Sequence, residues 1–217
     1  MYAPRISFGY ERVKSILNIR FREESWFRDT LSYVIARYTS IEERTVATFR
    51  YVDLDPKNAS SFSYEYASIL RDAGSCFAST LDRLVRLTRF NLSRREFDIL
   101  DYRKFLTASV PNIHSICLRV SYARSSIYLR PFSALGQEQE KIEWWDAYNK
   151  IKHSEIDMFR EGNLVNSLNA VASLAVIYAL MDFVNGASIR LFDEIGFVEP
   201  ENAISLCAIS HYPFDRS

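Results

Sequence analysis

The sequence is poor in the residues that mark several classes of protein. Of its 217 residues, only 6 are glycine, 6 are proline and 3 are cysteine. So little glycine and proline disfavours collagen-like, low-complexity and turn-rich all-β structures. The three cysteines are far apart and have no CxxC spacing, which predicts neither a disulfide framework nor a zinc site. We expect reduced thiols.

Long apolar runs are also missing. The strongest, over residues 170–181, has only a dozen residues, whereas a membrane span needs about 20. Residues 1–19 mix charged and apolar side chains and lack the continuous apolar core of a secretory signal. We therefore expect no membrane segment and a cytoplasmic location. The sequence has no phosphate-cradling glycine-rich loop, nucleophile elbow or metal-ligand spacing, and we predict neither a metal nor a cofactor.

The remaining composition is that of a globular protein, and its charge is unevenly distributed. Apolar residues make up 48% and charged residues 25%, which fits one domain over 1–217. Residues 1–130 carry 21 basic and 14 acidic groups, a net of +7, whereas residues 131–217 carry 6 and 13, a net of −7. Two interpretations are open. The two parts pair with each other, within one molecule or between two copies, or the basic part contacts nucleic acid.

Hydrophobic periodicity predicts a mainly α protein with a small β-hairpin. The pattern over 62–89 is strongly amphipathic, and alternating side chains at 117–122 and 126–130 predict the hairpin, at approximately 116–131. Ser93 and Glu96 have capping-box spacing. The tail, 196–217, has no clear pattern. Further predicted elements are helices at 23–38, about 137–159 and about 163–195, a short strand at 46–52, and a turn at 53–61.

One segment, EWWDAYNKIKHSEI at 143–156, departs from simple amphipathicity. On a helical wheel Lys152 falls near the centre of the apolar arc, and Asn149 and Glu155 fall inside it. A buried polar group without a partner costs roughly 2–7 kcal/mol. These side chains are therefore expected either to pair internally or to line a cleft. A third interpretation is a break in the helix, which would make the wheel invalid. The opposite, solvent-facing arc is predicted to hold Glu143, Asp146, Lys150, Ser154 and Asp157.

The string YNKIKH, preceded by two tryptophans and followed by a long small-and-apolar helix, resembles the motif helix of the HEPN superfamily. Residues 63–82 are similar to an early helix of such proteins. The resemblance covers roughly 60–90 and 137–195. It implies an antiparallel helical bundle that often dimerises, with the hairpin as an insertion. In many members it also implies a metal-independent ribonuclease of toxin–antitoxin, antiviral or other defence systems.

The family motif is an arginine, four to six residues, and then a histidine. His153 takes the histidine position. Asp146, Ala147 and Tyr148 stand where the arginine is expected, so this chain is a motif variant. If it acts on RNA, His153 is the expected acid/base, because histidine titrates near neutral pH. Asn149 would then orient the substrate, and Lys152 or an arginine such as Arg86 or Arg89 would supply positive charge.

Two other functions are open. A non-catalytic bundle could mediate protein association, or Tyr148 and Trp145 could form an aromatic pocket for a nucleotide or small molecule. A homodimer is expected, and face-to-face packing of its two copies would place two motif helices near each other in a composite cleft. Glu65 and Asp72 are expected either to pair on the helix surface with Arg71 or Arg83, or to support the His153 site.

Overall fold

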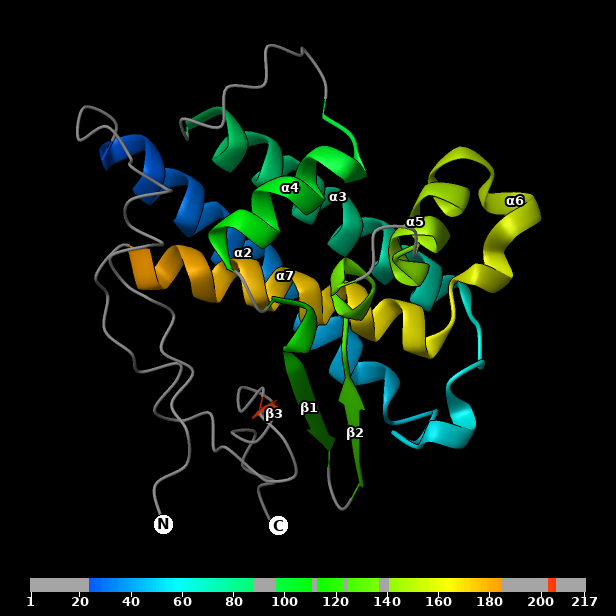
Figure 1. The fold of residues 1–217 in the computed structure, drawn as a ribbon. Helices are drawn as coiled ribbons and strands as arrows, with labels where there is room; N and C mark the ends of the chain where they lie inside the picture. Colours follow the sequence, from blue (N-terminus) through cyan, green and yellow to red (C-terminus); the bar gives the residue numbers. More distant parts are fainter. Residues whose placement is uncertain are drawn as a thin grey trace.

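The computed structural model describes residues 24–87, 97–110, 113–122, 125–136, 141–184 and 203–205. Helices dominate this part of the chain, and a small sheet packs beside them (Figure 1), which confirms the predicted mainly α class with a hairpin. In chain order the elements are α2 (Glu24–Thr48), η2 (Pro56–Asn58), α3 (Tyr64–Leu87), α4 (Ile99–Ser109), η3 (Ile113–Ser115), β1 (Cys117–Tyr122), β2 (Ser125–Leu129), η4 (Ser133–Gly136), α5 (Glu143–His153), α6 (Glu155–Met158), η5 (Phe159–Glu161), α7 (Leu164–Val184) and β3 (Ala203–Ser205).

Helix α3 is the centre of the bundle and contacts α2, α5 and, most extensively, α7. The Ser63 hydroxyl accepts a hydrogen bond from the backbone N–H of Tyr66, which satisfies one of the free donors at the helix start. The apolar stripe predicted at 62–89 is buried in α3, whereas Phe62, just before the helix, is exposed. The buried members of the stripe are Tyr66, Ile69, Leu70, Ala73, Cys76, Phe77, Leu81 and Leu84.

Helix α7 crosses the bundle with most of its circumference buried, as the apolar run at 170–181 predicts. Its start is fixed to the start of α3. The Ser63 N–H donates to the Gly162 carbonyl at 3.2 Å, and the Leu164 N–H donates to the Ser61 carbonyl at 2.9 Å. A Cβ at Gly162 would lie 2.5 Å from Ala67, so only glycine permits this approach. None of the described helices is both long enough and apolar enough to cross a bilayer.

The strand predicted at 46–52 is wrong, because α2 continues to Thr48 and a turn follows. The hydroxyls of Thr45 and Thr48 donate to the carbonyls of Ile41 and Thr45 within the helix, at 2.8 and 2.6 Å. Burial of these threonines and of Phe49 outweighs their intrinsic preference for strands.

The hairpin is confirmed, with Leu118 opposite Leu129 and Tyr122 opposite Ser125. Its inward side chains join the same apolar core as the helices, which supplies the support that an isolated hairpin lacks. The short strand β3, which the sequence pattern did not indicate, pairs parallel to β1. The Ser93 capping box lies outside the described residues. Asp98 and Asp101 form the observed capping box, at the start of α4.

Helix α5 runs antiparallel to α3, as two contacts establish. The Tyr148 ring lies against Gly74, and Trp144, one turn earlier in α5, meets Phe77, one turn later in α3. The helix predicted at 137–159 is wrong in its extent. The observed helix α5 ends at His153, because the next residue, Ser154, adopts a non-helical conformation. The Ser154 hydroxyl donates a hydrogen bond to the Asp157 carboxylate at 2.6 Å. The helix predicted at about 163–195 is described as α7 up to Val184, and its predicted part at 185–195 lies outside the described residues.

Gly74→Ala tests the contact between α3 and α5. The new Cβ would lie 2.5–3.0 Å from three atoms of the Tyr148 ring. Overpacking of this kind costs about 1–3 kcal/mol, which exceeds the gain of about 1 kcal/mol from helix propensity. We expect a lower free energy of unfolding in urea. Ser75→Ala, at the exposed neighbouring position, is the matched control and should be neutral or slightly stabilising. Equal stability of the two variants would contradict the close contact.

Candidate functional site

One face of α5 is anchored in an aromatic cluster. Trp144, Ala147, Tyr148 and Ile151 are buried, and Trp145 is half-buried. The Trp145 ring lies 5.2 Å from Tyr148 between centroids. It lies 5.7 Å from Trp144 and 5.9 Å from both Phe77 and Tyr102. Such tilted and edge-to-face contacts stabilise each pair by about 0.5–1.5 kcal/mol beyond burial. Tyr148 is therefore buried in the core, and Trp145 packs against it.

The Tyr102 hydroxyl ties α4 to this cluster. It donates a hydrogen bond to the Asp82 carboxylate on α3. Burial, together with the hydrogen bond and the negative charge of Asp82, raises the pKa of Tyr102 far above its ordinary value. The phenol therefore remains protonated at all physiological pH values, and its role is to hold α4 on α3.

Asn149, Lys152 and His153 lie at the C-terminal end of α5, on the surface. Lys152 and His153 are exposed, and Asn149, one turn before His153, is half-buried. The expectation that Lys152 lies inside a buried apolar arc is wrong. Helix α5 ends at His153, one residue after Lys152, and the Lys152 side chain is exposed. The Lys152 ammonium lies 5.7 Å from the Tyr148 ring centroid, within the range of a cation–π contact. Cations in the last turn also interact favourably with the helix dipole.

Arg86 lies away from this end of α5. Because α3 and α5 are antiparallel, His153 lies beyond Tyr148 toward the start of α3, whereas Arg86 lies toward its end. Arg86 is 12 residues beyond Gly74, roughly 18 Å along the axis. Its guanidinium lies 4.7 Å from the Phe97 ring centroid. Arg86 is therefore not a member of a site at His153, and Arg89 lies outside the described residues.

Glu65 and Asp72 form ion pairs with arginines of α2. Arg44 donates to Glu65 at 2.9 Å, to Asp72 at 2.6 Å and to Ser68 at 2.9 Å. Arg37 adds a longer contact to Asp72 at 3.7 Å. Pairing on the helix surface was the correct class of interaction. Arg44 and Arg37 lie 21 to 35 residues away in sequence, so no local spacing indicates them as partners.

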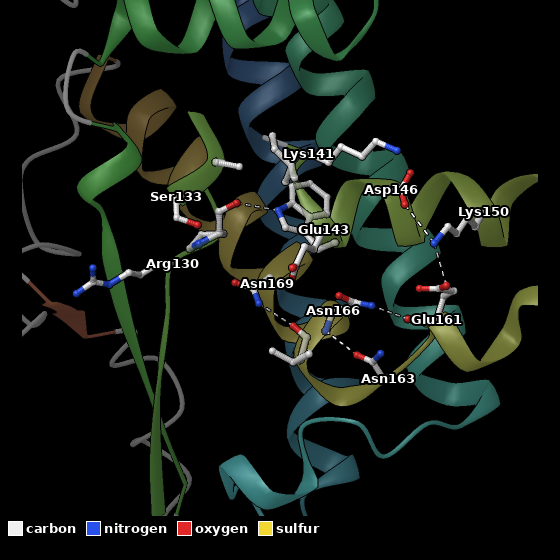
Figure 2. A pocket seen from close by; sticks show the side chains of 15 residues that line it. Arg130, Ser133, Lys141, Glu143, Asp146, Lys150, Glu161, Asn163, Asn166 and Asn169 are labelled. Atoms are coloured by element: carbon white, nitrogen blue, oxygen red, sulfur yellow. Dashed lines mark hydrogen bonds and ion pairs between the residues drawn. The ribbon is translucent and has the colours of Figure 1, made fainter. Parts of the chain in front are cut away.

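The opposite face of α5 lines a cleft of about 730 Å³ (Figure 2). Glu143, Asp146 and Lys150 were predicted to face solvent, and the structure places them along this cleft. None of Trp145, Tyr148, Asn149, Lys152 and His153 is among its lining residues, which come from the connector after β2, from α5, and from η5 and the start of α7. They are Arg130, Pro131, Ser133, Ala134, Lys141, Ile142, Glu143, Trp144, Asp146, Lys150, Glu161, Asn163, Val165, Asn166 and Asn169.

Three asparagines at three-residue spacing line the cleft: Asn163 just before α7, and Asn166 and Asn169 in its first turns. Asn163 accepts from the backbone N–H of Asn166, and the side-chain amides of Asn166 and Asn169 donate to the carbonyls of Glu161 and Val165, all at 2.9 Å. The carbonyl oxygens of the Asn166 and Asn169 amides are not used in these bonds and remain able to accept. Sequence spacing could have indicated this row, but it was not recognised as a candidate site.

The charged groups of the cleft are partly neutralised. The Lys150 ammonium lies 3.1 Å from Asp146 and 2.9 Å from Glu161 (Figure 2). The hydrogen bonds to these two carboxylates raise the pKa of Lys150, which therefore stays protonated. Arg130 and Lys141 make no ion pair of 4.0 Å or less within the described part of the chain. The cleft thus offers cations, carboxylates and amides together.

The described residues contain no group of three histidine, cysteine, aspartate or glutamate side chains that could hold a metal ion. Comparisons with known proteins give no relative. No protein-family model matches the sequence, and neither a curated protein nor a solved structure matches it. The resemblance to the HEPN superfamily therefore stays a prediction from the motif.

Trp144→Phe tests the hydrogen bond between Trp144 and Pro131, two of the residues that line the cleft. The Trp144 indole N–H donates to the buried carbonyl of Pro131 at 2.9 Å, and phenylalanine would leave that carbonyl without its donor. We expect a loss of about 1–3 kcal/mol in the free energy of unfolding. Trp145→Phe is the matched control, because its indole nitrogen makes no such bond within the described residues. A larger loss in the control would assign the stability to ring packing alone.

Proposed function

We propose that this chain is a HEPN-like protein that binds RNA at the C-terminal end of α5 and cleaves it without a metal ion. One observation supports the proposal: a histidine, a lysine and, one turn earlier, an asparagine share an end of α5 where His153 and Lys152 are open to solvent. A toxin or other defence role in the cytoplasm, and a homodimer that brings two such ends together, are parts of the same proposal.

The chemistry assigns one role to each group. The His153 imidazole takes the proton from a ribose 2′-hydroxyl, whose oxygen then attacks the adjacent phosphorus. The bond to the 5′-oxygen breaks, and that oxygen takes up a proton, leaving a cyclic phosphate on the first fragment. The Asn149 amide orients the phosphate, and the Lys152 ammonium offsets the developing negative charge. Lys152 would thus replace the arginine that Asp146, Ala147 and Tyr148 do not supply.

Cleavage of a labelled mixed RNA pool in EDTA tests the assignment of His153. We expect the parent protein to cleave and His153→Ala to lose cleavage by at least about 100-fold, the lower range for a general base. His114→Ala is the matched control, since His114 is also exposed but lies in η3. Equal cleavage by all three proteins would point to a contaminant. Absence of cleavage in the parent would leave binding or protein association as the function.

A second candidate function is supported by the cleft on the other face of α5. Its volume of about 730 Å³ is within the range of small-molecule sites. Amides that both donate and accept can recognise the edge of a nucleobase, and Arg130 and Lys141 can attract a phosphate. We infer that a mononucleotide is the class of ligand that fits this cleft.

Thermal unfolding in the presence of adenosine and guanosine 5′-monophosphates tests this second function. A ligand that binds the folded protein raises the melting temperature in a concentration-dependent way. We expect the rise to be lost in Asn169→Leu, which removes an acceptor in the cleft, and kept in Asn149→Ala, which lies outside it. If both nucleotides leave the parent's melting temperature unchanged, the cleft does not bind this class of ligand.

A further inference from the structure

Exposed aromatic rings gather at the end of the bundle that carries His153. Tyr64 is 73% exposed and Phe62 is 44% exposed. The Phe159 ring stacks on Tyr64 with centroids 5.5 Å apart and planes at 18°, and it meets Phe62 edge-on at 5.3 Å. The Arg160 guanidinium lies 5.3 Å from the Phe62 ring centroid. We call Phe62, Tyr64, Phe159 and Arg160 the aromatic platform.

The backbone holds the platform in place. Phe62 and Asn163 form an antiparallel bridge, and Ser63 donates to the Gly162 carbonyl. These bonds fix the residues before α3 against η5, so the rings on the two segments meet. One face of the Tyr64 ring is therefore covered by Phe159, and the high exposure of Tyr64 means that the other face is open to solvent. A fixed aromatic ring with one open face is a surface on which another planar group can stack.

The platform lies at the same end of the bundle as the proposed site. Helices α3 and α5 are antiparallel, so the N-terminal end of α3 and the C-terminal end of α5 lie at the same end of the bundle. Phe159 follows His153 by six residues, which span at most about 20 Å. Stacked nucleotides rise about 3.4 Å each along a strand, so about six of them would reach from one feature to the other.

We propose that the aromatic platform binds the bases of single-stranded RNA, with Tyr64 as the principal stacking residue. This inference rests on the proposed RNA function and names its substrate class. Base–aromatic stacking is the usual means by which proteins hold unpaired strands, and a guanidinium beside the rings suits the phosphate backbone. In a duplex the base faces are already stacked on one another and cannot reach Tyr64. The platform therefore selects unpaired RNA.

Other side chains near the platform bear on the choice of ligand. Ile156, which is 90% exposed, and Met158, which is 40% exposed, shortly precede Phe159 in the sequence. Of the nearby carboxylates, Glu161 forms an ion pair with Lys150, whereas Asp157 accepts a hydrogen bond from the neutral Ser154 hydroxyl and keeps its charge. Aromatic rings and an arginine favour bases and phosphates over an apolar protein surface. A second copy of this chain is the competing occupant, and the experiment distinguishes the two.

Fluorescence anisotropy of a labelled 2′-O-methyl RNA 12-mer, single-stranded or annealed to its complement, tests the proposal. Methylation blocks attack by the 2′-oxygen, so only binding is measured. We expect the parent to bind the single strand more tightly than the duplex. Tyr64→Ala should weaken single-strand binding about tenfold or more, and Tyr64→Phe should keep it. Tyr51→Ala is the matched control, because Tyr51 is 88% exposed and lies outside the platform; it should bind as the parent does.

Each contrary result has a separate meaning. If the parent binds neither form of RNA, the proposed RNA function is overturned and the platform's role falls with it. If the parent binds but Tyr64→Ala behaves as Tyr51→Ala does, only the platform is overturned. If sedimentation shows that Tyr64→Ala converts a dimer to a monomer while RNA affinity is unchanged, the platform is an interface between copies. Circular dichroism and melting temperature confirm that each variant is folded.

Discussion

The contact between the Tyr148 ring and Gly74 fixes α5 on α3, and both candidate sites depend on it. No side chain larger than hydrogen fits at position 74 beneath the ring. With Trp144 on Phe77 one turn away, the contact sets both the direction and the rotation of α5. The rotation turns Glu143 and Lys150 to the cleft. The direction places His153 at the same end of the bundle as the start of α3.

The side of α5 that faces the cleft and the C-terminal end of α5 carry different chemistry. The side toward the cleft bears charges that are largely paired, with Lys150 between two carboxylates. The end beyond Tyr148 bears Lys152 and His153 without an ion pair in the described residues. Paired charges fix geometry, whereas unpaired and exposed ones are free to meet a ligand. This difference is the reason why we propose acid/base chemistry for the end of α5 and ligand binding alone for the cleft.

Local patterns predict the elements that depend on local forces. The amphipathic stripe of α3, the burial of α7 and the existence of the hairpin follow from periodicity, because each buries one continuous apolar face. Errors arise where tertiary contacts or a single residue decide. The segment 46–52 is helix and turn because Thr45, Thr48 and Phe49 are buried against neighbours. Ser154 ends α5 and thereby exposes Lys152, which the helical wheel placed among apolar residues.

The residues of the candidate site could be predicted from the motif, but their surroundings in the fold could not. YNKIKH identifies Asn149, Lys152 and His153, and their closeness follows from helical spacing alone. The aromatic platform joins residues almost 100 positions apart, through backbone bonds between Ser63 and Gly162. Gly162 allows that approach because a Cβ would meet Ala67 at 2.5 Å. The same glycine thus brings α7 onto α3 and seats Phe159 on Tyr64, so core packing and the exposed stack have one structural origin.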